Sequence, residues 1–390
     1  MALFAPEEYR RRLDLTKAAM SKRGLDTILL SDPCNMFWLT GYNAFAFYTV
    51  QSMLVALDRS EPVYIGRGID VEAVRQSTAL SAGSMFGYTD DWIQYSGRSP
   101  ADFIAQTIEQ LGHAKGRMGV EMENYYLSPK VLDGLGRALP NVAIEDIGAL
   151  VNRCRSVKSP AEIVYMRQAA KIASNAMLKA LAMMAVGVRQ CDVAATVVQA
   201  QIAGVDGIGG SYTASPPFLL TGRRGAASHL TWDDDVFRKD ETAYLELTGN
   251  RYRYQITVSR AMHFGTPPKR VVDAAKASQE AIEIAMATAK PGATCADVFL
   301  AMQPVFKRWG MEKSTRCGYA IGIAYPPTAT ERSMSIHSSD TTILEPGMTF
   351  HVHPNLTFDD WGLYITESVV ITDKGCEPFT SIPRDLIVKH

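Results

Sequence analysis

The chain has 390 residues, of which 47% are hydrophobic and 21% are charged, so it has a globular composition and more length than one hydrophobic core usually covers. Its 40 basic and 41 acidic residues leave a formal net charge of −1, which argues against a nucleic-acid or anionic-membrane partner and favours a small-molecule substrate. The sequence has no signal-like apolar segment and no apolar run of about 18 residues, and its six cysteines lack CxxC spacing, so we expect a cytoplasmic protein of two domains with no membrane partner.

The first 150 residues alternate helical and strand patterns. Residues 7–24 are amphipathic and end at a glycine, which predicts a helix, and residues 25–31 predict a buried strand. Residues 51–58 and 61–66 are strand-like and separated by a short turn, which predicts a hairpin. Alternating helices and strands with short turns indicate an α/β layer domain.

A helix-start signal marks the boundary between the two predicted domains. In the segment RSVKSPAEI, Ser159 is suited to the N-cap, Pro160 to the first helical position and Glu162 to the third, which together make a capping box. Apolar residues recur at helical spacing behind it. The sequence therefore predicts domains at residues 1–158 and 159–390.

The second predicted domain contains a repeat. Gly187 and Asp192 share a Gly-x4-Asp-Val frame with Gly292 and Asp297, at an offset of 292 − 187 = 105 residues. Each copy follows an alanine-rich helical segment and precedes strand-rich sequence. The repeat predicts an α+β domain of two pseudo-twofold halves, with the β-halves facing each other and the helices outside. Coincidence between two ordinary alanine-rich helices is the alternative.

An acidic residue lies on an alternating strand in the first half of this repeat. Tyr244, Glu246 and Thr248 share one face of the strand, because side chains alternate between the two faces. A carboxylate that faces a cavity without a cation can bind a cationic group, activate water or attack an electrophilic carbon. The alternative is a strand glutamate that points to solvent.

Two histidines, His351 and His353, lie two residues apart and therefore share a face of a predicted strand. This spacing is common in metal sites and is the strongest argument for a metal in this chain. A lone histidine, His229, lies in a predicted loop, where a structural role is the ordinary alternative to a role in proton transfer.

The chain resembles the superfamily of creatinase, prolidase and methionine aminopeptidase. The resemblance rests on the motifs DPxNMxWLTGY, VKSPxEIxYMR, GVDGxGG, SHLTWDD, GYxIGxxYPPxxxER, PGMTFH and DWGLxITESVxIT, which span most of the chain. It implies an α/β N-terminal domain followed by a C-terminal domain of the duplicated type that the family calls the pita-bread fold.

The same resemblance implies that metal binding is lost. The metal enzymes of this superfamily hold two metal ions with two aspartates, a histidine and two glutamates. The corresponding positions of this chain are Glu246, Thr257, Tyr319, His353 and Thr366. Hydroxyl and phenol groups are poor substitutes for carboxylate or imidazole ligands of a divalent cation. We therefore expect no metal and no cofactor, as in the creatinase-like branch.

The resemblance also assigns roles to individual residues. It places His229, Glu246 and His353 in a catalytic group. It places an aromatic or charged lining around the substrate, and it implies a homodimer in which an N-terminal segment of one subunit reaches the active site of the other. The substrate-binding candidates are Phe47, Tyr48, Trp232, Tyr319, Glu331 and Glu367.

The motif combination most resembles the ectoine hydrolases, creatinase-like enzymes that open a cyclic amidine. It therefore implies a metal-independent hydrolase of a C–N bond in a small amidine or amide. Three alternatives stay open: a metal-dependent Xaa-Pro dipeptidase, a creatinase-like amidinohydrolase with another substrate, and a non-catalytic small-molecule binding protein.

Overall fold

The computed structural model describes residues 3–94 and 97–390 of the chain. The chain forms two compact units, Met1–Arg155 and Ser156–His390. None of the helices in the described residues is long and apolar enough to span a lipid bilayer.

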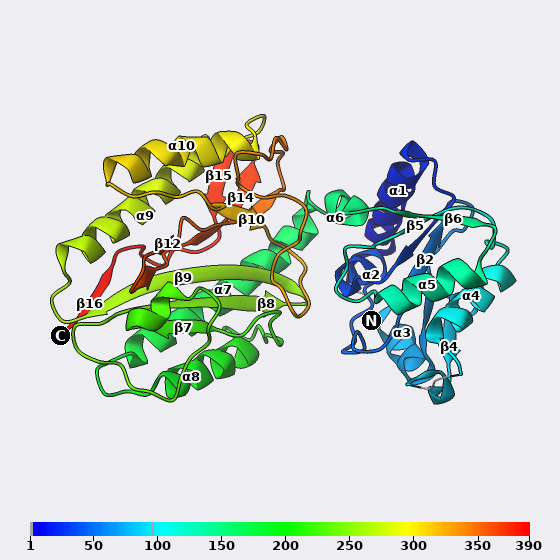
Figure 1. Ribbon diagram of the computed structural model, residues 1–390, viewed down its shortest axis with the longest axis horizontal. Coiled ribbons are helices and arrows are strands. Elements are labelled where there is room, and N and C mark those ends of the chain that lie inside the picture. The colour runs from blue at the N-terminus through cyan, green and yellow to red at the C-terminus, as the bar shows by residue number, and fades with distance from the viewer. Residues whose placement is uncertain (1–2, 95–96) are drawn as a thin grey trace. The chain divides into compact units, whose positions relative to one another are not determined.

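The first unit is a mixed six-stranded sheet with helices on both faces (Figure 1). The strand order is β4-β3-β2-β1-β5-β6, and the β1/β2 and β2/β3 pairs are antiparallel while the other neighbours are parallel. The predicted first helix, first strand and hairpin are confirmed. The elements are α1 (Pro6–Lys22), β1 (Thr27–Leu30), α2 (Pro33–Thr40), β2 (Ser52–Ala56), β3 (Val63–Arg67), α3 (Val71–Ser77), β4 (Met85–Tyr88), α4 (Pro100–Gln110), β5 (Gly116–Val120), α5 (Pro129–Ala138), β6 (Val142–Asp146) and α6 (Leu150–Cys154).

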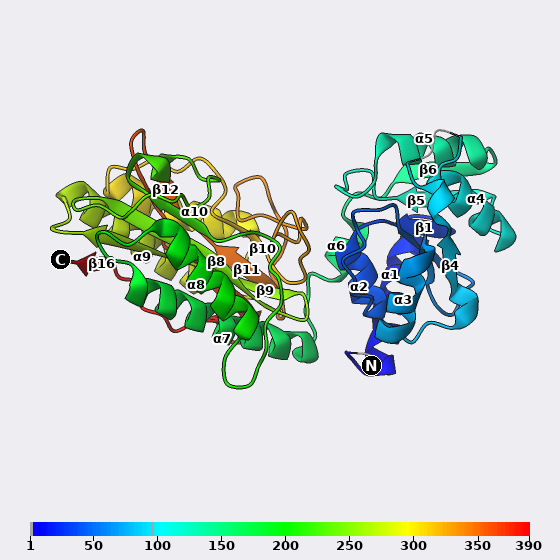
Figure 2. The same cartoon turned by 90° about the horizontal axis from the view of Figure 1, so that it is seen from below.

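Helices α4 and α5 lie side by side in both views of the first unit (Figures 1 and 2). Their apolar residues form one buried cluster with the strands, which includes Ile104, Ile108, Leu135 and Val120. Helix α1 contacts both α2 and α6. These two sets of helices bury the apolar sheet that the alternating sequence pattern predicts.

The second unit contains two helix pairs and two four-stranded sheets, with orders β16-β9-β8-β7 and β10-β11-β14-β15. The helices are α7 (Pro160–Met183), α8 (Gln190–Ala203), α9 (Lys269–Thr288) and α10 (Cys295–Arg308). The strands are β7 (Phe218–Thr221), β8 (Thr242–Arg251), β9 (Tyr254–Phe264), β10 (Gly318–Ala320), β11 (Thr349–Val352), β12 (Leu356–Thr357), β13 (Gly362–Leu363), β14 (Glu367–Thr372), β15 (Gly375–Pro378) and β16 (Ile387–Lys389). In Figure 1 the two helix pairs lie on opposite sides of the strands.

The predicted repeat is confirmed at the level of single turns. Helices α7 and α9 end at Met183 and Thr288, and 288 − 183 = 105. Helices α8 and α10 begin at Gln190 and Cys295, and 295 − 190 = 105. The glycines of the repeated frame, Gly187 and Gly292, both have left-handed backbones, with φ of 86° and 88°. Both sites require a glycine-like turn between paired helices, which explains the matching frame.

The start of the second unit has the predicted local structure. Ser159 caps α7, its side chain accepts from the Glu162 backbone N–H, and the Glu162 carboxylate accepts from the Ser159 N–H. Pro160 is the first helical residue. The compact units divide between Arg155 and Ser156, whereas the sequence placed the boundary after residue 158.

Candidate functional site

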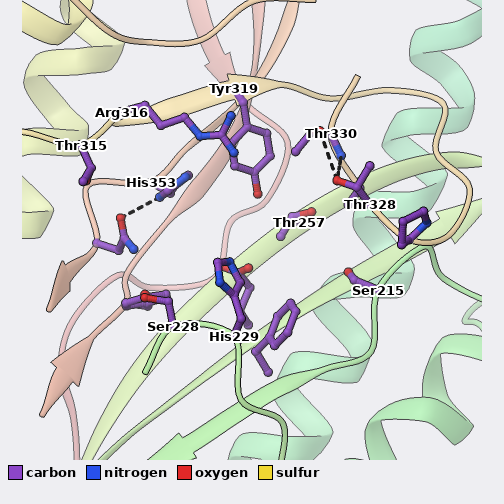
Figure 3. A pocket seen from close by; sticks show the side chains of 16 residues that line it. Ser215, Ser228, His229, Thr257, Thr315, Arg316, Tyr319, Thr328, Thr330 and His353 are labelled. Carbon is purple, nitrogen blue, oxygen red and sulfur yellow. Dashed lines mark hydrogen bonds between the residues drawn. The ribbon is translucent and has the colours of Figure 1, made fainter. Parts of the chain in front are cut away.

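A cavity of about 360 Å³ lies in the second unit, lined by residues from β7, β8, β9 and β10 and from the loops between elements (Figure 3). This volume falls within the range of small-molecule sites. The lining residues are Ser215, Phe218, Ser228, His229, Glu246, Thr257, Thr315, Arg316, Tyr319, Pro327, Thr328, Ala329, Thr330, His353, Asn355 and Tyr364.

The long antiparallel hairpin of β8 and β9 brings Glu246 and Thr257 to this cavity. Thr257 pairs with Thr248, which lies two residues beyond Glu246, so the three side chains share a face of the sheet. Leu245 and Leu247 point to the opposite face and join the core under α7 and α8. The alternation in the sequence is confirmed, and it directs the carboxylate into the cavity.

The carboxyl group of Glu246 lies at the cavity without a partner among the described residues. Among the described residues, no hydrogen bond or ion pair reaches its carboxylate. Burial raises the pKa of Glu246 from its ordinary value to about 7. A cationic ligand beside Glu246 would lower this pKa again, because a nearby positive charge stabilises the ionised carboxylate. The site therefore favours a cationic ligand.

His353 has one defined tautomer. Its Nδ1 lies 2.8 Å from Asn355 Oδ1, and the same oxygen accepts from the Lys313 ammonium at 2.9 Å. Because that oxygen accepts both bonds, Nδ1 carries the proton and Nε2 keeps its lone pair. Burial, with a further contribution from the Lys313 charge, lowers the pKa of His353 to about 3. The ring is therefore neutral at pH 7 and available as a hydrogen-bond acceptor.

Tyr319 is held by a short hydrogen-bonded chain. Its hydroxyl lies 2.9 Å from His351 Nδ1, and His351 Nε2 lies 2.7 Å from Thr366 Oγ1. Burial lowers the pKa of His351 well below its ordinary value, so its ring is neutral and donates only one of these bonds. In either tautomer the Tyr319 oxygen is fixed at one place, and Figure 3 shows it directed into the cavity.

His229 lies in the loop between η4 (Gly222–Ala226) and β8, and its ring packs edge-on against Phe218 at 6.2 Å. It is exposed to solvent and lines the cavity. The same cavity holds His353, whose pKa His229 helps to lower. The structure thus brings together His229, Glu246, His353 and Tyr319, all four of which the sequence singled out.

Several lining residues were missed in the sequence. Arg316 lies over the Tyr319 ring, with its guanidinium carbon 4.8 Å from the ring centroid. Thr328 and Thr330 belong to a loop, and their hydroxyl oxygens are 3.2 Å apart. Tyr364 stacks on Tyr244 at 4.1 Å. Arg316 lies three residues before Tyr319 in the sequence, so its closeness to that residue could be expected. A loop sequence does not, however, indicate which side chains enter a cavity.

Glu367 is not among the lining residues. It is fully buried, and its carboxylate accepts from Arg260 and Arg384 at 3.3 Å and from the Thr380 hydroxyl at 2.8 Å. These partners already neutralise and hydrogen-bond the carboxylate. We therefore assign Glu367 a structural role under the sheet in place of the substrate contact expected from the sequence.

Glu331 is also held away from the cavity lining. Its carboxylate forms an ion pair with Lys158 at 2.5 Å, and the two side chains are 0% and 1% exposed. The pair joins the start of the second unit to the loop that follows β10. A buried carboxylate in such a pair is committed to its partner, so we assign Glu331 to the scaffold.

We expect Lys158→Met to destabilise the second unit by about 3–5 kcal/mol, because it removes the ammonium partner of a buried carboxylate. The free energy of unfolding by urea measures this effect. Lys158→Met combined with Glu331→Gln should recover most of the loss, since no buried charge is left. An unchanged unfolding free energy in the single variant would contradict the assigned role.

The remaining substrate candidates are not among the residues that line this cavity. Trp232 packs against the apolar cluster between β8 and helices α7 and α8. Phe47 and Tyr48 belong to the first unit, where Phe47 contacts Phe45 at 4.7 Å and Tyr126 at 5.7 Å. The predicted contact of Phe47 and Tyr48 with the substrate of a second subunit stays a prediction.

The cavity does not fit the metal centre of the superfamily. Of the five positions that the resemblance gives as ligand positions, Glu246 and His353 carry residues of a ligating type. The Thr366 hydroxyl is bonded to His351. Nowhere in residues 3–94 and 97–390 do three or more His, Cys, Asp or Glu side chains gather to hold a metal ion. Two donors are too few for a dinuclear centre of hard cations.

Comparisons with known proteins agree with this architecture. The chain is 42% identical to the ectoine hydrolase of Halomonas elongata, with 99% of this chain and 98% of that protein covered. It is 40% identical to an uncharacterised hydrolase/peptidase, y4tM, of Sinorhizobium fredii, with the same coverage. The prolidase of Thermococcus sibiricus has the same fold, with a TM-score of 0.84 at 18% identity over 99% of this chain and 100% of that one. Residues 12–157 match the Creatinase/Prolidase N-terminal domain and residues 164–373 match metallopeptidase family M24, so the chain belongs to the M24 family, with a creatinase-type domain before its pita-bread domain.

Proposed function

We propose that this protein is a metal-independent hydrolase that opens the cyclic amidine ring of ectoine. The observation that carries the proposal is Glu246, a carboxylate with a pKa of about 7 and no partner among the described residues, in a cavity of small-molecule size. An amidinium is a small delocalised cation that matches this carboxylate. The 42% identity to an ectoine hydrolase over nearly the whole chain supports the choice of substrate.

Metal independence is part of the proposal and rests on the donor set. Thr257 and Tyr319 stand at two ligand positions of the superfamily, and neither offers a charged oxygen at neutral pH. Burial raises the pKa of Tyr319 above its ordinary value, which keeps the phenol protonated. The cavity instead presents hydrogen-bonding groups of the kind that position water and substrate.

The reaction adds water across an amidine. Water attacks the amidine carbon, one ring C–N bond breaks, and a proton moves to the departing nitrogen, which leaves an amide and an amine on one open chain. Glu246 pairs with the amidinium and favours its protonated form, in which the central carbon is electron-poor. His353 accepts a hydrogen bond from the attacking water through Nε2, and His229, which is in contact with solvent, moves the proton.

The choice of substrate is tested by a panel of candidate compounds. Purified protein is incubated with ectoine, creatine and an Xaa-Pro dipeptide, and products are followed by NMR. We expect the ring-opened acetamide product from ectoine and no cleavage of the other two. Faster release of proline from the dipeptide would overturn the proposal in favour of a dipeptidase.

We further propose a homodimer in which the aromatic segment around Phe47 covers the partner's cavity. Phe45 and Tyr48 are 61% and 66% exposed, and their rings lie 6.4 Å apart beside Phe47. Exposed aromatic clusters of this kind mark interaction surfaces. Light scattering should give a dimer, and the double variant Phe45→Ser, Tyr48→Ser should shift it toward monomer with loss of turnover. A fully active monomer would contradict this arrangement.

A further inference from the structure

The cavity presents one acidic and one strongly basic side chain, and neither has a hydrogen-bond or ion-pair partner among the residues that the structure describes. Of the sixteen lining residues, Glu246 and Arg316 are the acidic and the strongly basic member. Among the described residues, no hydrogen bond or ion pair reaches the Arg316 guanidinium, which lies over the Tyr319 ring. The Arg316 side chain is exposed to solvent at the cavity, and its fork of N–H donors matches the two oxygens of a carboxylate.

The backbone that directly follows Arg316 is anchored by hydrogen bonds. The Cys317 N–H donates to Ile336 O at 2.8 Å, and the Cys317 carbonyl accepts from the His353 N–H at 2.9 Å. Gly318 then pairs with Val352 in the sheet. These bonds hold the backbone next to Arg316 in place, so its side chain is the part that has to be ordered when an anion binds.

The charges of Glu246 and Arg316 both affect the pKa of Tyr319. After burial, which has the largest effect, the Glu246 carboxylate raises the pKa of Tyr319 and the Arg316 guanidinium lowers it. In Figure 3 the Arg316 side chain lies beside the Tyr319 ring, and the Tyr319 hydroxyl is directed into the cavity. The two charged groups therefore act on one small volume, as a ligand with two opposite charges requires.

We propose that Arg316 binds the carboxylate of the substrate, so that the cavity selects zwitterions that carry an amidinium and a carboxylate on neighbouring atoms. The inference rests on the proposed function and adds its substrate class. Ectoine has this form: its carboxylate is attached to a ring carbon next to an amidine nitrogen. Glu246 would bind the amidinium and Arg316 would bind the carboxylate.

The test compares ectoine with the same cyclic methyl-amidine that lacks the carboxylate. In the wild type we expect kcat/KM to be about 10- to 100-fold higher for ectoine, the worth of a charge-assisted hydrogen bond. Arg316→Met should reduce this ratio to near one, with the rate on the carboxylate-free amidine little changed. Arg316→Lys should retain part of the preference, because lysine keeps the charge and loses the fork. Arg167→Met, at an exposed surface ion pair, is the control and should keep the wild-type ratio.

Two outcomes distinguish carboxylate binding by Arg316 from a structural role of this residue and from failure of the proposed function. If Arg316 only supports the Tyr319 ring, Arg316→Met lowers the rates on both compounds by the same factor, and the inference is overturned. If the wild type hydrolyses neither compound, the proposed function fails, and calorimetric affinities decide the inference: an ectoine preference that disappears in Arg316→Met supports it. Equal binding of both compounds, or binding of neither, overturns it.

Discussion

Glu246→Gln should lower kcat/KM for ectoine by about 10- to 150-fold, which corresponds to the loss of about 1.5–3 kcal/mol of charge-assisted hydrogen bonding. The substitution keeps the shape of the side chain and removes its charge. The effect should fall on substrate binding, because the carboxylate holds the amidinium. Steady-state kinetics and calorimetry on the same variant measure both quantities.

The pH profile provides a second readout for Glu246. Its pKa of about 7 means that the carboxylate is protonated below this pH and ionised above it. Since the ionised form pairs with the amidinium, kcat/KM should fall as the pH drops below about 7 and level off above it. Glu246→Gln should lose this acidic limb.

Two other results are informative for this residue. If Glu246 attacks the amidine carbon itself, Glu246→Gln abolishes turnover while ectoine still binds measurably, and the ion-pairing role is replaced by a covalent one. Near-normal turnover would refute both roles. Glu283→Gln, an exposed glutamate on α9, is the matched control and should behave as the wild type.

His229→Ala should lower kcat by roughly 10²–10⁴, the usual range for a general acid–base group, without a change in the unfolding free energy. The side chain is exposed at the cavity, so its removal leaves no buried void. Single-turnover kinetics with ectoine measure the effect. Added imidazole should restore part of the rate, because the site is open to solvent.

A purely structural His229 would give a different pattern. Loss of stability in parallel with activity, or no response to imidazole, would show that the ring only packs against Phe218. Unchanged kcat in a stable variant would remove His229 from the proton-transfer step.

Local sequence patterns were sufficient for the elements that depend on neighbours in the chain. The capping box at Ser159 fixes the start of α7, and the alternation around Glu246 fixes which strand face meets the cavity. The repeat could be recognised because Gly187 and Gly292 both occupy a left-handed backbone conformation, which favours glycine, in the turn between paired helices. In each case the constraint acts within a few residues, so the sequence alone exposes it.

Long-range partners were beyond such patterns. The commitment of Glu331 to Lys158 joins residues 173 positions apart, and the contacts of Glu367 with Arg260 span 107 positions. Nothing near either glutamate in the sequence distinguishes a buried ion pair from a substrate contact. Arg316 was missed for a different reason. What distinguishes it is the lack of a hydrogen-bond or ion-pair partner among the described residues, and only the three-dimensional structure reveals this.

The central claim, amidine hydrolysis without a metal, is tested most directly by turnover of ectoine after exhaustive chelation. Bound metals are quantified by mass spectrometry in the same sample, before and after treatment. We predict far less than one metal ion per chain and an unchanged kcat/KM, because Glu246 and His353 are the two metal-type ligands left at five positions. Stoichiometric metal, together with loss of turnover on chelation and recovery on adding the metal back, would contradict the claim.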